Sequence, residues 1–122
     1  MARQSLTDAF KNAGAGIVKT SVERNFRIEL GFLVLVVVLG LFYHISVLEW
    51  AVVFVCCALV LGGECLNSSL EAIVDLASPD YHELAGKAKD CAAGAVLVFS
   101  LGSLAVGVII FLPRIAQTVG LC

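Results

Sequence analysis

Residues 91–112 read CAAGAVLVFSLGSLAVGVIIFL, and no residue in this stretch carries a formal charge. A helix needs about 20 mainly apolar residues to cross the roughly 30 Å hydrocarbon core of a bilayer. Backbone groups in lipid must be hydrogen-bonded within their own segment, so the stretch predicts a transmembrane helix. Residues 30–48 and 50–70 form two further stretches of the same kind. The sequence therefore predicts three membrane-spanning helices.

The composition supports this prediction, because the 122 residues are 60% hydrophobic and 15% charged, with a formal net charge of −2. A soluble domain would be about half apolar and about a quarter charged. These values argue against an ordinary soluble enzyme and against a nucleic-acid binder with a basic face, so we expect no nucleic-acid partner. With polar helix ends included, we expect one domain over residues 1–122, with spans at 28–48, 50–76 and 91–113.

The basic residues predict the orientation of these spans. Five precede the first span: Arg3, Lys11, Lys19, Arg24 and Arg27. The connection at residues 44–49 has no Lys or Arg, whereas the connection before the third span contains Lys87 and Lys89. Because positive charge accumulates on the cytoplasmic side, we expect the N-terminus and the second connection to be cytoplasmic.

Residues 3–22 are predicted to form an amphipathic helix rather than a span. Apolar side chains recur at steps of four, three and four: Leu6, Phe10, Ala13 and Ile17. This spacing is typical of a helix that lies in the cytoplasmic interface of the membrane. The first long apolar run begins only at Leu30 and has no small-residue cleavage site after it, so no cleavable signal peptide is expected.

The second span ends in a polar stripe, within the sequence GGECLNSSLEAIVDLAS at residues 62–78. At about 100° per residue, and with Glu64 at zero, Asn67 falls at about 300°, Glu71 at about 340° and Asp75 at about 20°. The four side chains therefore share one helix face, and Glu64 lies about 10 Å deeper than Glu71. Charged groups inside a membrane are costly and usually mark function.

This stripe indicates a particular chemistry. A deep carboxylate with no cation nearby in the sequence suits a general base that acts on a membrane-buried hydroxyl. Shallower carboxylates suit Mg²⁺, which usually shares its ligand shell with phosphates. The stripe thus predicts a lipid alcohol below and a nucleotide phosphate above. The structural alternatives are a solvated helix end for Glu71 and Asp75, and a helix–helix hydrogen bond for Asn67.

Three segments carry a resemblance to a known family. Residues 64–75, ECLNSSLEAIVD, match the pattern E-x-x-N-[ST]-A-[IL]-E-x-x-V-D, with Ser69 in place of the usual alanine. The AKD at residues 88–90 and the ERNFR at residues 23–27 fit as well. The chain resembles the small prokaryotic diacylglycerol kinases, which include the undecaprenol kinases of Gram-positive bacteria.

The resemblance implies an all-α integral membrane protein with three transmembrane helices and an N-terminal surface helix. It also implies a homotrimeric bundle in a bacterial cytoplasmic membrane, with active sites shared between neighbouring subunits. The expected activity is that of a kinase that transfers the γ-phosphate of ATP to a lipid alcohol, either diacylglycerol or undecaprenol.

The resemblance also assigns the lipid side of the site. Glu64 would be the general base that takes the proton from the lipid hydroxyl. Asn67 would order the site around it, and Glu29 would lie near the lipid headgroup.

On the nucleotide side, the resemblance implies that Glu23 and Glu71 hold the Mg²⁺ that bridges the ATP phosphates. Further nucleotide contacts would come from Asp80, Tyr81, His82, Lys89 and Asp90. Lys89 taken alone could equally be an ordinary cytoplasmic anchor. Asp75 is expected to have a supporting polar role.

Two questions stay open at this point. A rotor-ring proteolipid, or another small ion-translocating subunit, would also use one carboxylate such as Glu64 in a membrane helix. Such a subunit would be a two-helix hairpin, whereas this chain has three predicted spans and several acids. The acceptor is also open, because residues 47–50 and 111–114 resemble Gram-positive members and residues 81–84 resemble Gram-negative ones.

Overall fold

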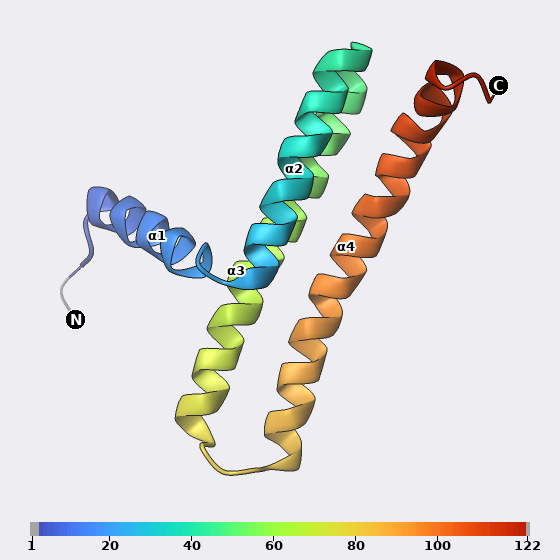
Figure 1. Cartoon of the computed structure of the whole chain (residues 1–122). Helices are drawn as coiled ribbons and strands as arrows, with labels where there is room; N and C mark the ends of the chain where they lie inside the picture. The colour runs from blue at the N-terminus through green and yellow to red at the C-terminus, as the bar shows by residue number, and fades with distance from the viewer. Residues whose placement is uncertain (1–2, 122) are drawn as a thin grey trace.

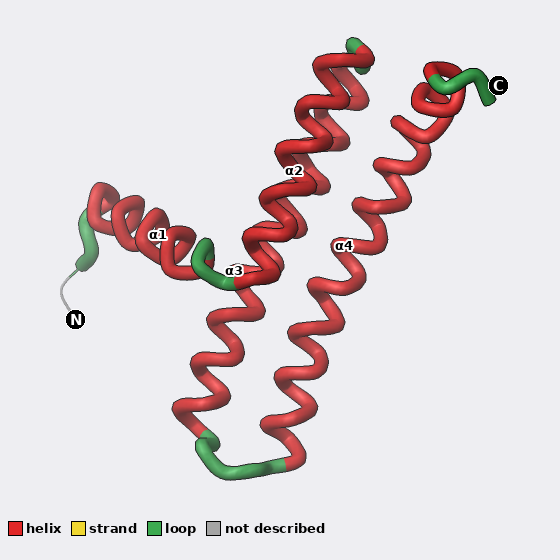
Figure 2. The backbone as a smooth tube through the Cα atoms, viewed as in Figure 1, coloured by secondary structure: helices red, strands yellow, loops and turns green. Residues whose placement is uncertain are grey.

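The computed structural model describes residues 3–121, and within that range it contains four α-helices and no strand. The helices are α1 (Leu6–Thr20), α2 (Arg24–Tyr43), α3 (Val47–Ala77) and α4 (Glu83–Thr118). Figure 2 shows that short loops join them, so almost all of the described chain is helical. Residues 1, 2 and 122 of the predicted domain lie outside the described range. The prediction of an all-α protein is confirmed.

Helices α2, α3 and α4 are each long and apolar enough to cross a membrane, which confirms the expectation of three spans. They contain 20, 31 and 36 residues respectively. Figure 1 shows α3 and α4 as an antiparallel hairpin, with α2 packed against α3. The hairpin continues well past the start of α2, so its loop end projects beyond the rest of the bundle.

Helix α1 projects sideways from the bundle at the level where α2 begins (Figure 1). Three apolar side chains of its predicted stripe, Leu6, Phe10 and Ile17, are exposed. An apolar helix face that has no protein partner among residues 3–121 is typical of a helix that lies on a membrane surface.

Local capping explains where three of the helices begin. Ser5 caps α1, and Ser46 and Glu49 form a reciprocal capping box at the start of α3. His82 caps α4 through its ring nitrogen. Each cap satisfies backbone N–H groups that have no partner within the helix. Glu23 occupies the same position at α2, but its side chain makes no capping hydrogen bond.

The end of the bundle that contains the α2–α3 connection and the C-terminus of α4 is well packed, and we call it the closed end. Its buried apolar cluster consists of Ile45, Val53, Ile110 and Phe111. Gly40 lets the α3 side chain Trp50 approach α2, since a Cβ at Gly40 would lie 2.6 Å from Trp50 Cη2.

Polar side chains also join the helices at the closed end. Arg114 of α4 donates two hydrogen bonds to the Glu49 carboxylate, at 2.8 and 2.9 Å. The hydroxyl groups of Tyr43 and Thr118 lie 3.0 Å apart and hydrogen-bond α2 to α4. At the closed end, the negative charge of Glu49 on α3 is therefore paired with the positive charge of Arg114 on α4.

Candidate active site

Glu64 lies on α3, and only 2% of its surface is exposed even in the single chain. The residue before it, Gly63, has no side chain, so the Phe99 ring of α4 packs against the α3 backbone there. A Cβ at Gly63 would lie 2.8 Å from Phe99 Cδ2. The carboxylate that the sequence places within the second span is therefore buried between helices.

Glu29 of α2 is the second carboxyl at this depth. The side chains of Glu64 and Ser100 lie next to its carboxyl group, so α2, α3 and α4 each contribute a polar group here. Atom Oε2 of Glu29 is buried and has no hydrogen-bond partner within residues 3–121. Oδ1 of Asn67 is in the same situation. Two buried acceptor atoms thus remain for a ligand that can donate a hydrogen bond.

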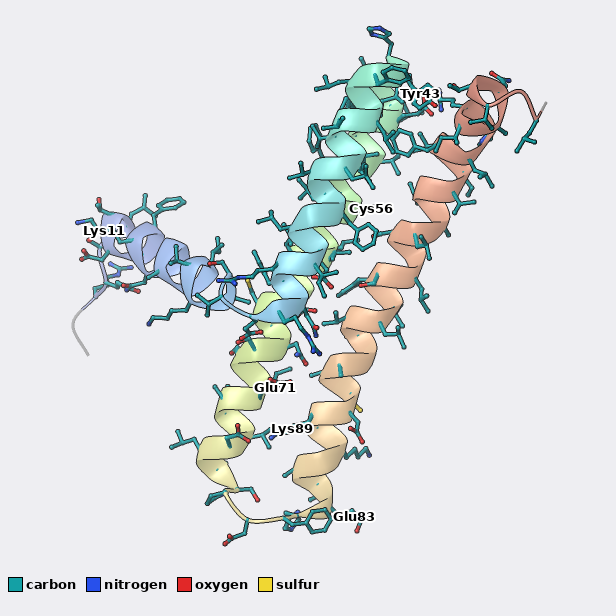
Figure 3. The ribbon with its side chains drawn as sticks, viewed as in Figure 1. Lys11, Tyr43, Cys56, Glu71, Glu83 and Lys89 are labelled. Atoms are coloured by element: carbon teal, nitrogen blue, oxygen red, sulfur yellow. The ribbon has the colours of Figure 1, made fainter. Side chains whose placement is uncertain are left out.

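Glu29 also lines a cavity of about 430 Å³ between α2, α3 and α4, which we call the membrane groove. Its other lining residues are mainly apolar and include Phe32, Val36, Leu104 and Phe111. Figure 3 labels Cys56, a further lining residue, midway along the bundle. The groove is thus a mainly apolar space, suited to a hydrocarbon chain, with one carboxyl in its lining.

Two further carboxylates lie above Glu64, toward the loop of the hairpin. Glu23 accepts a hydrogen bond of 2.5 Å from the Ser68 hydroxyl. Glu71 accepts one of 3.2 Å from Nδ2 of Asn67. Both carboxylates lie close enough to Glu64 to interact with it electrostatically. The structure therefore brings together residues that are separated by more than 40 positions in the sequence.

We call Glu23, Glu29, Glu64 and Glu71 the carboxyl cluster. Among the described residues, the ion pairs are Lys89–Asp75 and Arg114–Glu49, so no member of the cluster is paired with a cation. Repulsion between such groups favours the binding of a positive ion among them.

The donors of this cluster fit a metal that is shared with a substrate. In the part of the chain that the structure describes, no three His, Cys, Asp or Glu side chains are arranged to hold a metal ion on their own. Mg²⁺ usually binds through one or two carboxylates and substrate phosphates rather than in an all-protein cage. Glu23 and Glu71 therefore fit a Mg²⁺–nucleotide complex better than a permanently bound metal.

Lys89 faces α3 from α4, and its ammonium group forms an ion pair with Asp75. The Lys89 side chain is 42% exposed and the Asp75 side chain 66%, so solvent reaches the pair. Figure 3 shows Lys89 and Glu71 on neighbouring helices near the loop of the hairpin. Because an exposed ion pair is weak, Asp75 can be exchanged for another anion at little cost.

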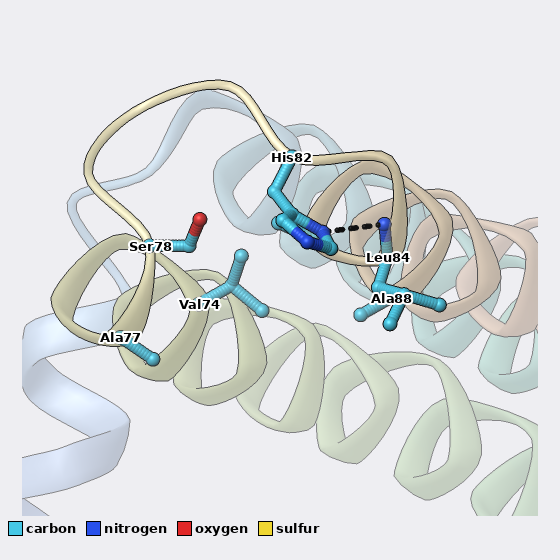
Figure 4. Close-up of a pocket in the computed structure, with 7 residues that line it drawn as sticks. Val74, Ala77, Ser78, His82, Leu84 and Ala88 are labelled. Carbon is cyan, nitrogen blue, oxygen red and sulfur yellow. Dashed lines mark hydrogen bonds between the residues drawn. The ribbon is translucent and has the colours of Figure 1, made fainter.

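The hairpin loop contributes a second, smaller cavity of about 370 Å³, lined by Val74, Ala77, Ser78, His82, Leu84, Ala85 and Ala88. Figure 4 shows His82 at its edge, where the ring accepts the backbone hydrogen bond of Leu84. Asp80, Tyr81 and Asp90 are exposed, and within residues 3–121 none of their side chains hydrogen-bonds to the carboxyl cluster. The single chain thus does not bring these three predicted nucleotide contacts to the cluster.

Reasoning on the sequence missed Ser68, Phe99 and Ser100 as neighbours of the site. At about 100° per residue, and with Glu64 at zero, Ser68 falls at about 40°, at the edge of the polar stripe and beside Asp75. A helical projection of α3 alone could not show that α2 lies in that direction. The small residue at Gly63 was the available signal for a close contact beside Glu64.

Comparisons with known proteins identify the family of this chain. Residues 11–111 match the family described as prokaryotic diacylglycerol kinase. The undecaprenol kinase of Bacillus subtilis is 40% identical over 112 residues, which cover 88% of each chain. A diacylglycerol kinase of Synechocystis is 40% identical over 111 residues, 89% of this chain and 63% of that protein.

The diacylglycerol kinase of Escherichia coli K12 is 37% identical over 76 residues, which cover 62% of each chain. None of these matches supports a rotor-ring proteolipid or another ion-translocating subunit. The chain belongs to the prokaryotic diacylglycerol kinase family and is a membrane lipid kinase.

Proposed function

We propose that this protein transfers the γ-phosphate of Mg²⁺–ATP to the hydroxyl of a membrane lipid alcohol, at the carboxyl cluster. One observation carries the proposal. The buried Glu64 lies next to Glu29, which lines the membrane groove, and within electrostatic reach of Glu23 and Glu71, and it has no cation partner among residues 3–121. A lipid hydroxyl from one side and a nucleotide from the other can therefore meet at Glu64.

On the lipid side, the hydrocarbon chain of the acceptor lies in the membrane groove and its hydroxyl points toward Glu29. Glu29 lines the groove beside Glu64, so a hydroxyl placed there can donate its single hydrogen to the Glu64 carboxylate. Glu64 then takes this proton as the hydroxyl oxygen attacks the γ-phosphorus, and the bond from the γ-phosphorus to the bridging β-phosphate oxygen breaks, which releases ADP. General-base catalysis of this kind contributes about 10²–10⁴-fold to a rate.

On the nucleotide side, Glu23 and Glu71 hold Mg²⁺. Each uses one oxygen for its hydrogen bond to α3, which leaves the second oxygen for the metal. The bound ion neutralises phosphate charge, which is the main requirement of phosphoryl transfer besides positioning. Asn67 orders the site, because it holds Glu71 from the position one turn above Glu64.

Lys89 binds a phosphate of the nucleotide in place of Asp75, which holds the lysine in position until then. Asp90 and the loop residues Asp80, Tyr81 and His82 supply the remaining nucleotide contacts. The second cavity, beside His82, gives this part of the nucleotide a place on the surface of the hairpin (Figure 4).

The working unit in this proposal is a homotrimer in the bacterial cytoplasmic membrane, and each chain is one domain over residues 1–122. The N-terminus and the α3–α4 loop are cytoplasmic, as the distribution of Lys and Arg predicts. Large apolar side chains are exposed along all three spans. Lipid and neighbouring subunits would cover these surfaces and bring further residues to the loop end of the site.

Undecaprenol is the first candidate for the acceptor, because the relative named undecaprenol kinase aligns with 88% of both chains. Diacylglycerol is the second candidate, on the names of the Synechocystis and E. coli relatives.

The test is to give the purified, detergent-solubilised protein Mg²⁺–ATP with either undecaprenol or diacylglycerol, and to measure the phosphorylated lipid. We expect a higher kcat/KM for undecaprenol. A higher value for diacylglycerol would reverse the choice of acceptor. Failure to release ADP with either lipid alcohol would refute the proposed reaction. The proposed trimer is tested separately, by measuring the mass of the detergent-solubilised particle.

A further inference from the structure

Glu23 occupies the N-cap position of α2 but does not cap that helix. A carboxylate at this position commonly accepts hydrogen bonds from the first backbone N–H groups of its own helix. Here the backbone of Glu23 is extended, with φ −72° and ψ 142°, yet no side-chain capping bond forms. The carboxylate instead reaches across to α3, where it accepts the hydroxyl hydrogen of Ser68 at 2.5 Å.

Ser68 likewise does not use its hydroxyl within its own helix. A serine inside a membrane helix commonly bonds to the carbonyl one turn earlier, which for Ser68 would be that of Glu64. The hydrogen bond that its hydroxyl donates goes to Glu23, 45 residues away in the sequence. This contact fixes the start of α2 against α3 at the level of the carboxyl cluster.

Asn67 and Ser68 together hold both proposed Mg²⁺ ligands. Asn67 donates along α3 to Oε1 of Glu71, and Ser68 donates across to Oε1 of Glu23. Successive residues of a helix point about 100° apart, which is why one step of the chain can serve carboxylates on two different helices. In each case the second carboxylate oxygen lies outside these hydrogen bonds.

We infer that Ser68 is a positioning residue for Mg²⁺–nucleotide binding, because its hydroxyl holds the Glu23 carboxylate in the orientation that the metal requires. The inference rests on the proposed function, in which Glu23 and Glu71 are the metal ligands. It adds that the binding strength of the site depends on a side chain that itself does not contact the metal.

The test measures how tightly the full-length protein in detergent binds the Mn²⁺–AMP-PNP complex, by electron paramagnetic resonance, alongside KM for Mg²⁺–ATP and for the lipid. Ser68→Ala removes the hydroxyl, Ser68→Cys keeps the volume but has only a weak donor, and Ser68→Thr restores the hydroxyl. Ser69→Ala is the matched control, since this neighbouring serine is exposed and makes no side-chain hydrogen bond within residues 3–121. Glu23→Gln tests the metal ligand itself.

We expect Ser68→Ala and Ser68→Cys to weaken Mn²⁺–AMP-PNP binding and to raise KM for Mg²⁺–ATP by about tenfold, the size of one lost hydrogen bond to a charged group. KM for the lipid should not change, and Ser68→Thr and Ser69→Ala should bind like the wild type. If Glu23→Gln weakens binding but Ser68→Ala and Ser68→Cys do not, the inference is wrong and the proposed function stands. If Glu23→Gln also leaves binding unchanged, the proposed metal site itself is wrong.

Discussion

The bundle has acidic groups at both ends, but they are paired with a cation at one end and left without one at the other. At the closed end the Glu49 carboxylate is matched by Arg114 through two hydrogen bonds, beside a packed apolar cluster. In the carboxyl cluster, four acids from α2, α3 and the turn before α2 have no cation partner among residues 3–121. Charges that are satisfied within the chain stabilise the fold, whereas charges left unsatisfied are available for a ligand.

The same difference separates two carboxylates of one helix. Glu49 and Glu64 both lie on α3. Glu49 is hydrogen-bonded to Arg114 of α4, whereas Glu64 lies next to the carboxyl group of Glu29 on α2. The Glu49 carboxylate, whose side chain is 25% exposed, already accepts two hydrogen bonds from Arg114. A buried carboxylate beside other carboxylates raises the free energy of the folded chain until a cation or proton donor binds.

The largest effect is expected for Glu64→Gln, which removes the general base and keeps the size of the side chain. We expect kcat to fall by about 10²–10⁴-fold, while assembly and nucleotide binding stay largely unchanged. Phosphorylated lipid and Mn²⁺–AMP-PNP binding are measured on the same preparation. Turnover close to that of the wild type would show that Glu64 is not the base.

The next largest effect is expected for Glu71→Gln, which removes one negative ligand from the proposed metal site. The apparent Mg²⁺ concentration for half-maximal activity should rise by about tenfold or more, because a charge-assisted contact is lost. EDTA should stop the reaction of the wild type without changing its helical circular dichroism signal. An unchanged Mg²⁺ dependence in the variant would argue against Glu71 as a metal ligand.

A matched pair of glycine variants compares the two ends directly. Gly40→Ala would bring a methyl group against Trp50 at the closed end, and Gly63→Ala would bring one against Phe99 beside Glu64. Overpacking of this kind costs about 1–3 kcal/mol, so both variants should unfold at lower SDS concentrations. Only Gly63→Ala should also lower kcat of the folded protein. Equal loss of kcat in both would mean that the two ends are coupled rather than separate in function.

The smallest effect on turnover is expected at the closed end, for Arg114→Met. This variant leaves the Glu49 carboxylate without its cation, so resistance to SDS should decrease. The kcat of the protein that remains folded should not change, because the ion pair lies at the opposite end from the carboxyl cluster. A clear loss of kcat would refute the division of the molecule into a structural end and a reactive end.

The sequence predicted what depends on local periodicity. The three spans follow from apolar length, and the shared face of Glu64 and Glu71 follows from 3.6 residues per turn. The start of the third spanning helix, α4, could not be predicted from hydropathy, because the apolar stretch begins at residue 91 whereas α4 begins at Glu83. Four of the first eight residues of α4 are charged, so hydropathy does not extend the span to them, and their helix begins at the His82 cap.

Contacts between helices could not be predicted in this way. Glu23 and Glu29 entered the predicted site only through the resemblance to a family, since neither shares a helix with Glu64. The bonds from Ser68 to Glu23 and from Lys89 to Asp75 depend on the relative height and rotation of two helices. Composition and spacing within one helix contain no information on those two quantities.

The unequal lengths of the helices have a consequence for the membrane itself. At 1.5 Å per residue, the 20 residues of α2 span about 30 Å, which matches the hydrocarbon core. The 31 residues of α3 span about 46 Å, so in the proposed orientation one unbroken helix would carry Glu64 within the lipid and Glu71 at the water boundary. Because no linker absorbs a mismatch, a thicker bilayer would draw the proposed metal-binding carboxylates toward the hydrocarbon, and we expect activity to depend on lipid chain length.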